Sequence, residues 1–278
     1  MYKLSFVIPC YYSKNTVGDV VNRIIKTVKS DGRYDYEIVC VNDGSTDGTY
    51  AVLRELADDN PRIKVIDLSR NFGQHAALMA GFNHVNGDII VCLDDDGQNP
   101  PEEMFKLIDK CEEGYDLVSA KYPNDISRSL IRRLGSKISF AMSRKLISMP
   151  EDIELNSYYC MKRFVVDEII KYDNSYPFVH GLALRVTRNI ANVDMTHNER
   201  ADGKSGYNLR KLIRLWLNGF TAFSAVPLRV ASFVGLLSAV VGIIFAIVII
   251  ILRLTHVIRA VGYASTVAII LFFCGLIM

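Results

Sequence analysis

The chain has 278 residues, of which half are apolar and 22% are charged, and its formal net charge is +2. This composition excludes an intrinsically disordered chain and a collagen-like repeat, and the length suffices for one large domain or a domain with an appendage. The six cysteines are scattered without a C-x-x-C pair, so neither a zinc site nor a disulfide framework is expected.

Short apolar runs alternate with helical patterns along the first 120 residues. Repeated β-α units of this length predict an α/β fold with a mostly parallel sheet that is covered on both faces. In such sheets, ligands bind beyond the carboxyl ends of the strands. In chain order, the predicted elements are strand Leu4–Pro9, helix Val17–Val28, strand Tyr36–Asn42, helix Thr49–Ala57, strand Ile63–Leu68, helix Gln74–Phe82, strand Ile89–Leu93, helix Pro101–Cys111 and strand Tyr115–Ala120.

Polar loops follow the first four predicted strands, and these loops are expected to converge on one edge of the sheet. No G-x-G-x-x-G motif occurs, which disfavours a dinucleotide-binding fold. The loops read P-C-Y-Y from Pro9, N-D-G-S-T-D-G from Asn42, S-R-N-F-G-Q-H from Ser69 and D-D-D-G-Q from Asp94.

The carboxylates of the fourth loop suit a hard divalent cation. In an extended loop alternate side chains point the same way, so Asp94, Asp96 and Gln98 can face one site while Asp95 faces away. The alternative is a solvated acidic turn. Against it, the run follows a fully apolar strand, where mutual repulsion would be costly without a cation. A catalytic metal site is therefore the favoured interpretation.

The C-terminal part of the chain differs in charge and polarity. No Asp or Glu follows Asp202, whereas seven Lys or Arg do, and 38 of the 52 residues from Pro227 onward are apolar. Val230–Leu252 is uncharged over 23 residues, which as a helix would be about 34 Å long against a hydrocarbon core of about 30 Å. A second uncharged run, Ala260–Met278, follows a short basic turn. The pattern predicts a transmembrane hairpin; the alternative is a pair of helices buried in a soluble core.

The hairpin implies three regions, namely a globular domain over 1–205, an amphipathic juxtamembrane segment over 206–226, and two spans within 227–278. The middle segment is interpreted as an interfacial helix, although a helix packed on the globular domain has the same periodicity. Basic residues are more frequent before the first span than in the turn, which places the globular domain in the cytoplasm of a multi-pass cell-membrane protein. The first apolar run is too short for a signal peptide.

Taken together, the motifs V-I-P-C-Y, V-N-D-G-S-T-D-G-T, R-N-F-G-Q and D-D-D-G-Q resemble family 2 glycosyltransferases with the GT-A fold. The later N-E-R-A-D-G-K-S-G-Y, followed by a basic amphipathic stretch and two spans, resembles the polyprenyl-phosphate branch of that family, which includes bactoprenol glucosyltransferases and dolichol-phosphate mannose synthases. The match covers nearly the whole chain.

The resemblance implies roles for individual residues on the donor side. Asp96 would be the main ligand of a divalent cation, Mg²⁺ or Mn²⁺, with Asp94 near the metal or the ribose and Gln98 completing the set. Asp43 would accept a hydrogen bond from the base, which favours uracil or guanine, and His75 is given no role. The expected nucleotide-sugar-binding residues are Pro9, Tyr11, Asp43, Gly73, Gln74, Asp94 and Asp95.

On the acceptor side, the resemblance places phosphate-binding groups at Arg200, Lys204 and Ser205. A second basic cluster lies on a predicted amphipathic helix over 126–147. Arg128 and Arg132 of this cluster are also predicted to bind the acceptor phosphate. The alternative interpretations of the cluster are a solvated helix face and attraction to anionic headgroups.

One position departs from the family pattern. In much of the branch, an Asp that is a candidate general base stands where this chain has Ser157. The identity of a general base is therefore left open.

These observations predict an enzyme that transfers a single sugar, with inversion, from a nucleotide sugar to polyprenyl phosphate at the cytoplasmic membrane face. UDP-glucose or another UDP-hexose is the expected donor. The alternatives are a glycosyltransferase that extends a lipid-linked saccharide or wall polymer, and a silent scaffold that binds nucleotide sugars. The expected partners are the donor, the polyprenyl phosphate acceptor and the membrane; a homo-oligomer is left open and nucleic acid is not expected.

Overall fold

The computed structural model describes residues 2–123, 153–198 and 226–255, with isolated positions at 262, 266, 269, 270 and 273. The chain divides into two compact units, Met1–Leu215 and Trp216–Met278. Each unit is considered separately below.

The first unit is an α/β domain built on one seven-stranded sheet of order β3-β2-β1-β4-β6-β5-β7. The pairs β1/β2, β2/β3, β1/β4 and β5/β7 are parallel, and only β6 runs against its neighbours β4 and β5. The predicted mostly parallel sheet is confirmed. The strands are β1 Lys3–Cys10, β2 Asp35–Asn42, β3 Ile63–Asp67, β4 Ile89–Cys92, β5 Leu117–Lys121, β6 Tyr159–Lys162 and β7 Ile190–Asp194.

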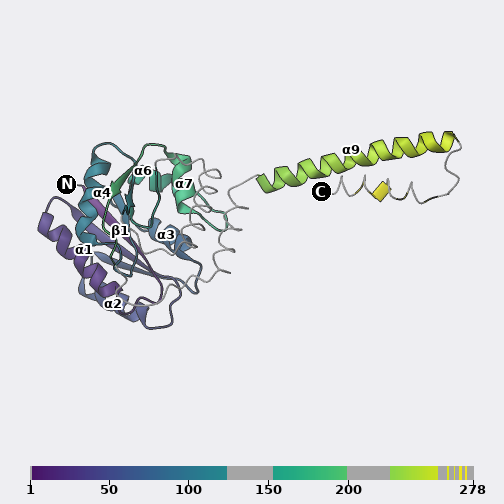
Figure 1. Ribbon diagram of the computed structural model, residues 1–278. Helices are drawn as coiled ribbons and strands as arrows, with labels where there is room; N and C mark the ends of the chain where they lie inside the picture. Colours follow the sequence, from purple (N-terminus) through teal and green to yellow (C-terminus); the bar gives the residue numbers. More distant parts are fainter. Residues whose placement is uncertain are drawn as a thin grey trace. The chain divides into compact units, whose positions relative to one another are not determined.

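Helices cover both faces of this sheet, with α1 and α4 on one side and α3 and α7 on the other (Figure 1). The helices are α1 Val17–Asp31, α2 Thr49–Asp59, α3 Gln74–Phe82, α4 Met104–Glu112, α6 Arg163–Ile169 and α7 Val179–Val186, with a 3₁₀ helix, η1, at Pro101–Glu103.

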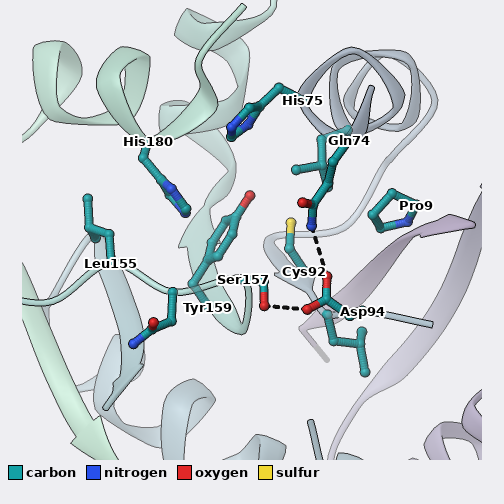
Figure 2. A pocket seen from close by; sticks show the side chains of 12 residues that line it. Pro9, Gln74, His75, Cys92, Asp94, Leu155, Ser157, Tyr159 and His180 are labelled. Atoms are coloured by element: carbon teal, nitrogen blue, oxygen red, sulfur yellow. Dashed lines mark hydrogen bonds between the residues drawn. The ribbon is translucent and has the colours of Figure 1, made fainter. Parts of the chain in front are cut away.

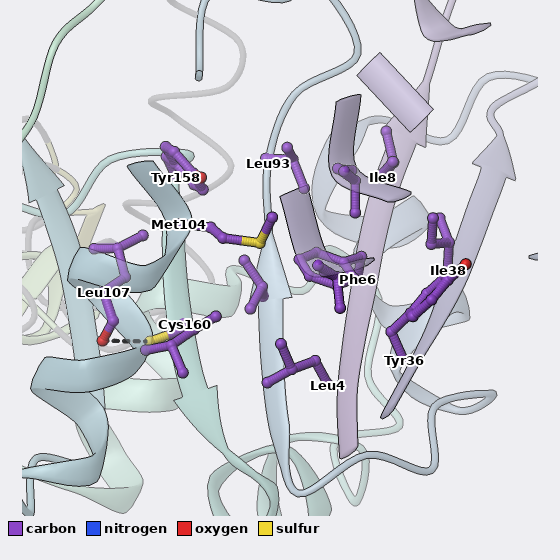
Figure 3. Close-up of a cluster of buried hydrophobic side chains, with 14 of the residues drawn as sticks. Leu4, Phe6, Ile8, Tyr36, Ile38, Leu93, Met104, Leu107, Tyr158 and Cys160 are labelled. Atoms are coloured by element: carbon purple, nitrogen blue, oxygen red, sulfur yellow. Dashed lines mark hydrogen bonds between the residues drawn. The ribbon is translucent and has the colours of Figure 1, made fainter. Parts of the chain in front are cut away.

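Successive side chains of a strand point to opposite faces of the sheet, and in β1 apolar side chains point to both faces. Leu4, Phe6 and Ile8 of β1 point to the face covered by α1, α2 and α4, and they belong to the buried cluster drawn in Figure 3. The intervening Val7 points to the other face, where a Cβ on Gly81 of α3 would lie 2.4 Å from its Cγ1. Because helices bury both faces of the sheet, a central strand needs apolar residues at successive positions.

The structure corrects several predicted boundaries and adds elements. The predicted helix Pro101–Cys111 begins as the 3₁₀ turn η1, and the predicted strand Tyr115–Ala120 starts later, at Leu117. The chain from residue 159 onward contributes β6, α6, α7 and β7, none of which the sequence pattern predicts. Because β6 is inserted between β4 and β5, it brings a distant part of the chain to the middle of the sheet.

The second unit contains helix α9, Val226–Leu254, which has 29 residues and no Asp or Glu. Large apolar side chains along it are exposed, including Phe233, Leu236, Leu237, Ile244 and Ile251. Among the residues that the structure describes, no helix is both long enough and apolar enough to cross a membrane. The predicted span 230–252 overlaps α9, and the predicted span 260–278 lies largely outside the described residues.

Candidate active site

Hydrogen bonds tie together the four loops that follow β1 to β4. The Tyr11 N–H donates to Asp95 Oδ2 at 2.9 Å, which joins the loops after β1 and β4. The Phe72 N–H donates to Asp43 Oδ1 at 2.7 Å, which joins the loops after β2 and β3. The predicted convergence of these loops on the carboxyl edge of the sheet is confirmed.

Asp94, the first carboxylate of the fourth loop, is held by side chains from three directions. Gln74 of α3 donates its Nε2–H to Asp94 Oδ1 at 2.8 Å, and Asn99 donates to Oδ2 at 3.3 Å. The Ser157 hydroxyl also donates to Oδ2 (Figure 2). These bonds fix the direction of the carboxylate before any substrate arrives.

Asp95 points away from Asp94, toward the loop after β1. Burial raises the pKa of Asp95 to about 6, and the Asp94 and Asp96 carboxylates also raise it, against the lowering effect of the hydrogen bond from the Tyr11 N–H and of the nearby Ser13 side chain. Its contacts thus connect the carboxylate loop to Tyr11, on the loop that follows Pro9 and the end of β1; both residues are predicted to bind the donor.

Asp96 and Gln98 complete the carboxylate loop. The Gln98 N–H donates to Asp96 Oδ1 at 3.1 Å, and the Gln98 side-chain Nε2 lies 3.1 Å from His197 Nε2 and 3.4 Å from the Asn198 carbonyl oxygen. The segment after β7 therefore packs against the predicted metal-binding loop.

The donor atoms of this loop fit a divalent cation that is shared with a substrate. Burial raises the pKa of the Tyr122 hydroxyl, and the charges of Asp94 and Asp96 raise it further, so both carboxylates lie near this hydroxyl. In the described parts of the chain, no group of three or more His, Cys, Asp or Glu side chains is arranged to hold a metal ion. Mg²⁺ is commonly held by one or two carboxylates together with substrate phosphates, which this pair satisfies.

Asp43, the predicted base-binding residue, is buried with 3% of its surface exposed. Its two carboxylate oxygens accept the backbone N–H groups of Phe72 and Gly73, at 2.7 and 2.9 Å. Asp43 therefore shapes the loop before α3, and its contact with a base stays a prediction. Gly44 has a φ of 67°, and a Cβ there would meet the backbone carbonyl carbon of Arg70 at 2.3 Å, so these two loops can close together only at a glycine.

The predicted base wall lies on the loop after β1. Tyr11 is 46% exposed and its ring packs edge-on against Tyr12, with 4.6 Å between the ring centroids. Tyr12 adopts a left-handed backbone with a φ of 57°, and its hydroxyl lies 2.7 Å from Thr46 Oγ1. A strained non-glycine residue at this edge is typical of a functional loop.

A cavity of about 240 Å³ opens beside Asp94 (Figure 2). Four of its polar wall residues have no role predicted from the sequence, namely His75, Asn156, Tyr159 and His180. No sequence signal indicated the last two, because β6 and α7 were not predicted. The complete lining is Pro9, Gln74, His75, Leu78, Cys92, Leu93, Asp94, Leu155, Asn156, Ser157, Tyr159 and His180.

Ser157 is positioned by its neighbour. The Asn156 N–H donates to Ser119 Oγ at 2.9 Å, and the Asn156 side chain donates to the Ala120 carbonyl at 2.7 Å, so this residue is pinned to β5. The residue that stands in place of the family's candidate base is therefore held against Asp94.

The predicted acceptor-binding residues Arg128, Arg132, Arg200, Lys204 and Ser205 lie outside the described residues. The described ends of the chain around the first two are informative. β5 ends at Lys121 and the antiparallel β6 begins at Tyr159, which pairs with Ser119 of β5 and Cys92 of β4. The connection over 122–158 therefore leaves and re-enters the domain at the edge that carries Asp94.

Comparison with known proteins agrees with this fold. A model of Glycosyl transferase family 2 matches residues 5–170. An undecaprenyl-phosphate 4-deoxy-4-formamido-L-arabinose transferase from Proteus mirabilis is 36% identical over 98% of this chain and 84% of its own length. An uncharacterised glycosyltransferase, YkcC, from Bacillus subtilis is 31% identical over 99% of this chain and 84% of its own.

Among solved structures, glucosyl-3-phosphoglycerate synthase from Mycobacterium tuberculosis, in complex with Mn²⁺, UDP and phosphoglyceric acid, superimposes with a TM-score of 0.58. The two chains are 20% identical, and the match covers 78% of this chain and 75% of that one. This likeness supports the fold. The chain therefore belongs to glycosyl transferase family 2, adopts the GT-A fold, and is a glycosyltransferase, as the sequence predicts.

Proposed function

We propose that this protein transfers one sugar from a nucleotide sugar to polyprenyl phosphate at the cytoplasmic face of a membrane. The observation that carries the proposal is the carboxylate loop Asp94–Gln98, which is fixed by Gln74, Tyr11 and Ser157 at the carboxyl edge of the sheet. The Proteus mirabilis relative, named for transfer to undecaprenyl phosphate, supports the choice of a lipid phosphate as the acceptor.

For the donor, we propose a UDP-linked sugar. Asp43, Pro9 and Tyr11 are the residues expected to contact the base, and the solved glucosyl-3-phosphoglycerate synthase with the same fold contains UDP. UDP-glucose or another UDP-hexose is retained as the first candidate, and the arabinose derivative in the name of the Proteus mirabilis relative adds UDP-pentoses to the candidates.

The proposed chemistry is a single inverting displacement. A lipid phosphate oxygen attacks the anomeric carbon, and the bond from that carbon to the diphosphate breaks. Asp94, Asp96 and Gln98 would hold a divalent cation, which supplies positive charge for the departing diphosphate. Gln74 and Ser157 keep Asp94 oriented through their hydrogen bonds.

A strong general base is not required at Ser157. The second pKa of a phosphate monoester is about 6, so the acceptor oxygen is already largely ionised at neutral pH. The residues around the acceptor need to position the phosphate rather than deprotonate it. Arg128, Arg132, Arg200, Lys204 and Ser205 are proposed for that task, because a lipid phosphate at a membrane surface needs cationic partners.

We further propose that the second unit anchors the enzyme. The exposed apolar side chains of α9, such as Phe233 and Leu236, would be stable in lipid, and the stretch 230–252 contains no charged residue. A second span over 260–278 would complete a hairpin and keep the catalytic domain on the cytoplasmic side.

The proposal is tested by incubating membranes that contain the full-length protein with polyprenyl phosphate and a panel of labelled nucleotide sugars, with and without EDTA. We expect a labelled glycolipid from at least one donor, and EDTA should abolish it. Asp96→Asn should remove the product, whereas Asp58→Asn, a matched change at an exposed position of α2, should leave it intact. Absence of glycolipid from every donor would overturn the proposal.

A further inference from the structure

The cavity beside Asp94 contains buried polar atoms without partners in the described structure. His75 Nδ1, the Tyr159 hydroxyl and His180 Nε2 are all inaccessible to solvent and make no hydrogen bond. Tyr159 is 1% exposed, and its hydroxyl points between the two imidazoles (Figure 2). Buried polar groups are nearly always hydrogen-bonded in folded proteins, so three such atoms in one cavity indicate a missing partner.

The three side chains come from different elements and form one cluster. The His180 ring centroid lies 5.0 Å from that of Tyr159 and 6.0 Å from that of His75. Phe178 closes the cluster, with its ring 5.0 Å from His75. Elements α3, β6 and α7 therefore converge on this polar recess, defined by His75, Tyr159 and His180.

The cavity adjoins the proposed reaction centre and meets the place proposed for the base at one residue. Asp94 and Ser157 line the cavity, and so does Pro9, whereas Asp43 and Tyr11 do not. The cavity volume of about 240 Å³ is below the usual range of pockets for drug-sized ligands. It suits one monosaccharide unit rather than a whole nucleotide sugar.

We propose that His75, Tyr159 and His180 form the recess that recognises the transferred sugar through an uncharged hydroxyl or acylamino group. This inference rests on the proposed function, and it assigns residues that determine which sugar is used. A neutral imidazole and a phenol each donate and accept hydrogen bonds, as does a sugar hydroxyl or an amide, so such a group can satisfy all three atoms.

The electrostatics of the recess favour an uncharged guest. Burial lowers the pKa of His75 to about 4, and burial, together with the nearby His75, lowers the pKa of His180 to about 3. Both rings are therefore neutral at physiological pH. A carboxylate on the sugar would find no cation in the recess, because both rings are neutral, and Asp94 would repel it. An ammonium group would have to lose its hydration shell, and Asp94, the only acid in the cavity lining, already accepts three hydrogen bonds.

Adjacent tyrosines provide a matched pair of variants. The Tyr159 hydroxyl faces the recess and has no hydrogen-bond partner among the described residues. Burial raises its pKa, and the Cys92 thiol and the Asp94 carboxylate raise it further. The Tyr158 hydroxyl, on the opposite face of the sheet, donates to the Pro100 carbonyl at 3.1 Å. Tyr→Phe removes one oxygen in each case without changing the shape of the ring.

The recess predicts opposite effects for the two substitutions. Tyr159→Phe should leave the melting temperature of the full-length protein unchanged or raised, because an unsatisfied buried group is removed, while kcat/KM for the donor falls about tenfold. Tyr158→Phe should lower the melting temperature and leave kcat/KM unchanged. His180→Phe is expected to act like Tyr159→Phe on kcat/KM.

The experiment measures turnover with UDP-glucose, UDP-galactose, UDP-N-acetylglucosamine, UDP-arabinose, UDP-glucosamine and UDP-glucuronic acid, and thermal stabilisation by each of them and by UDP alone. The preferred donor should carry only uncharged groups on its sugar and should stabilise the wild-type protein more than UDP does. Tyr159→Phe should remove that extra stabilisation and retain the effect of UDP.

The outcomes separate this inference from the function on which it rests. Turnover by the wild-type protein with equal kcat/KM in Tyr159→Phe and Tyr158→Phe would overturn the recess and leave the proposed function standing. A preferred donor with an ammonium or carboxylate on its sugar would do the same. If no donor is turned over and none stabilises the protein, both are overturned.

Discussion

Glu37 provides a test of how the fold is stabilised at the edge of the sheet opposite to the active site. It lies near the start of β2, and its side chain is 4% exposed. Oε1 accepts hydrogen bonds from Ser5 Oγ, at 2.6 Å, and from the Asn86 N–H, while Oε2 accepts from Lys64 Nζ at 2.9 Å and Lys3 Nζ at 3.2 Å. Burial alone would raise the pKa of Glu37, but these donors lower it from 4.5 to about 2.

The size of the stabilisation by Glu37 follows from the lowering of its pKa. At about 1.4 kcal/mol for each pKa unit, the lowered pKa of Glu37 corresponds to about 3 kcal/mol of stability. Lys3 and Lys64 are 32% and 40% exposed, so solvent screens part of the interaction, and we expect Glu37→Gln to lower the free energy of unfolding by about 2 kcal/mol at pH 7. Because the folded pKa is below the unfolded one, this stabilisation is complete above pH 4.5 and is lost as the pH falls toward 2.

The assay is urea unfolding of the full-length protein followed by pulse proteolysis, for the wild type and Glu37→Gln at pH 7 and pH 3. The difference between the two proteins should shrink by half or more at pH 3, while kcat/KM at pH 7 is the same for both. A difference that does not depend on pH, or one near zero at pH 7, would refute the reasoning.

Substitutions at Asp43, at Gly44 with Gly73, and at Ser157 test the site. Asp43→Asn replaces one acceptor of the Phe72 and Gly73 N–H groups with an amide donor. We expect the free energy of unfolding, measured in urea, to fall by about 1–3 kcal/mol, and UDP to bind more weakly in calorimetry. Unchanged values for both would contradict the role given to this loop. Gly44→Ala should destabilise the protein more than Gly73→Ala, since a Cβ at 44 meets backbone at 2.3 Å while one at 73 meets nothing within 4 Å; thermal melts of equal midpoint would show the clash to be unimportant. Ser157→Ala removes a donor to Asp94 and should lower kcat/KM about tenfold, with partial recovery in Ser157→Thr; full turnover by the alanine variant would mean that Asp94 needs no such support.

The sequence predicted the parts of the fold that depend on local periodicity. The strands that precede Asp43 and Asp94 contain continuous apolar runs, Ile38–Val41 and Ile89–Cys92, which fit burial on both faces, and the loops after parallel strands meet at one edge. Alternation along the loop also predicts that Asp94 and Asp95 diverge, as their hydrogen bonds show.

The remaining features depend on contacts between distant residues. β6 has only four residues, Tyr159–Lys162, and nothing in so short a run shows that it pairs antiparallel between β4 and β5. Without β6, the meeting of Ser157 with Asp94 could not be predicted. His180 was missed for the same reason, because its place in the cavity depends on how α7 packs against α3.

The insertion of β6 also determines how the connection over 122–158 is attached to the sheet. The connection over 122–158 is tethered at both ends to neighbouring strands, through Lys121 of β5 and Tyr159 of β6. Its last residues are part of the site and the core, because Asn156 contacts Ser119, Ser157 donates to Asp94 and Tyr158 donates to Pro100. An exchange of this connection with that of a relative must therefore keep residues 153–158, and it would then replace Arg128 and Arg132, which are proposed to bind the acceptor, on the same donor-binding framework.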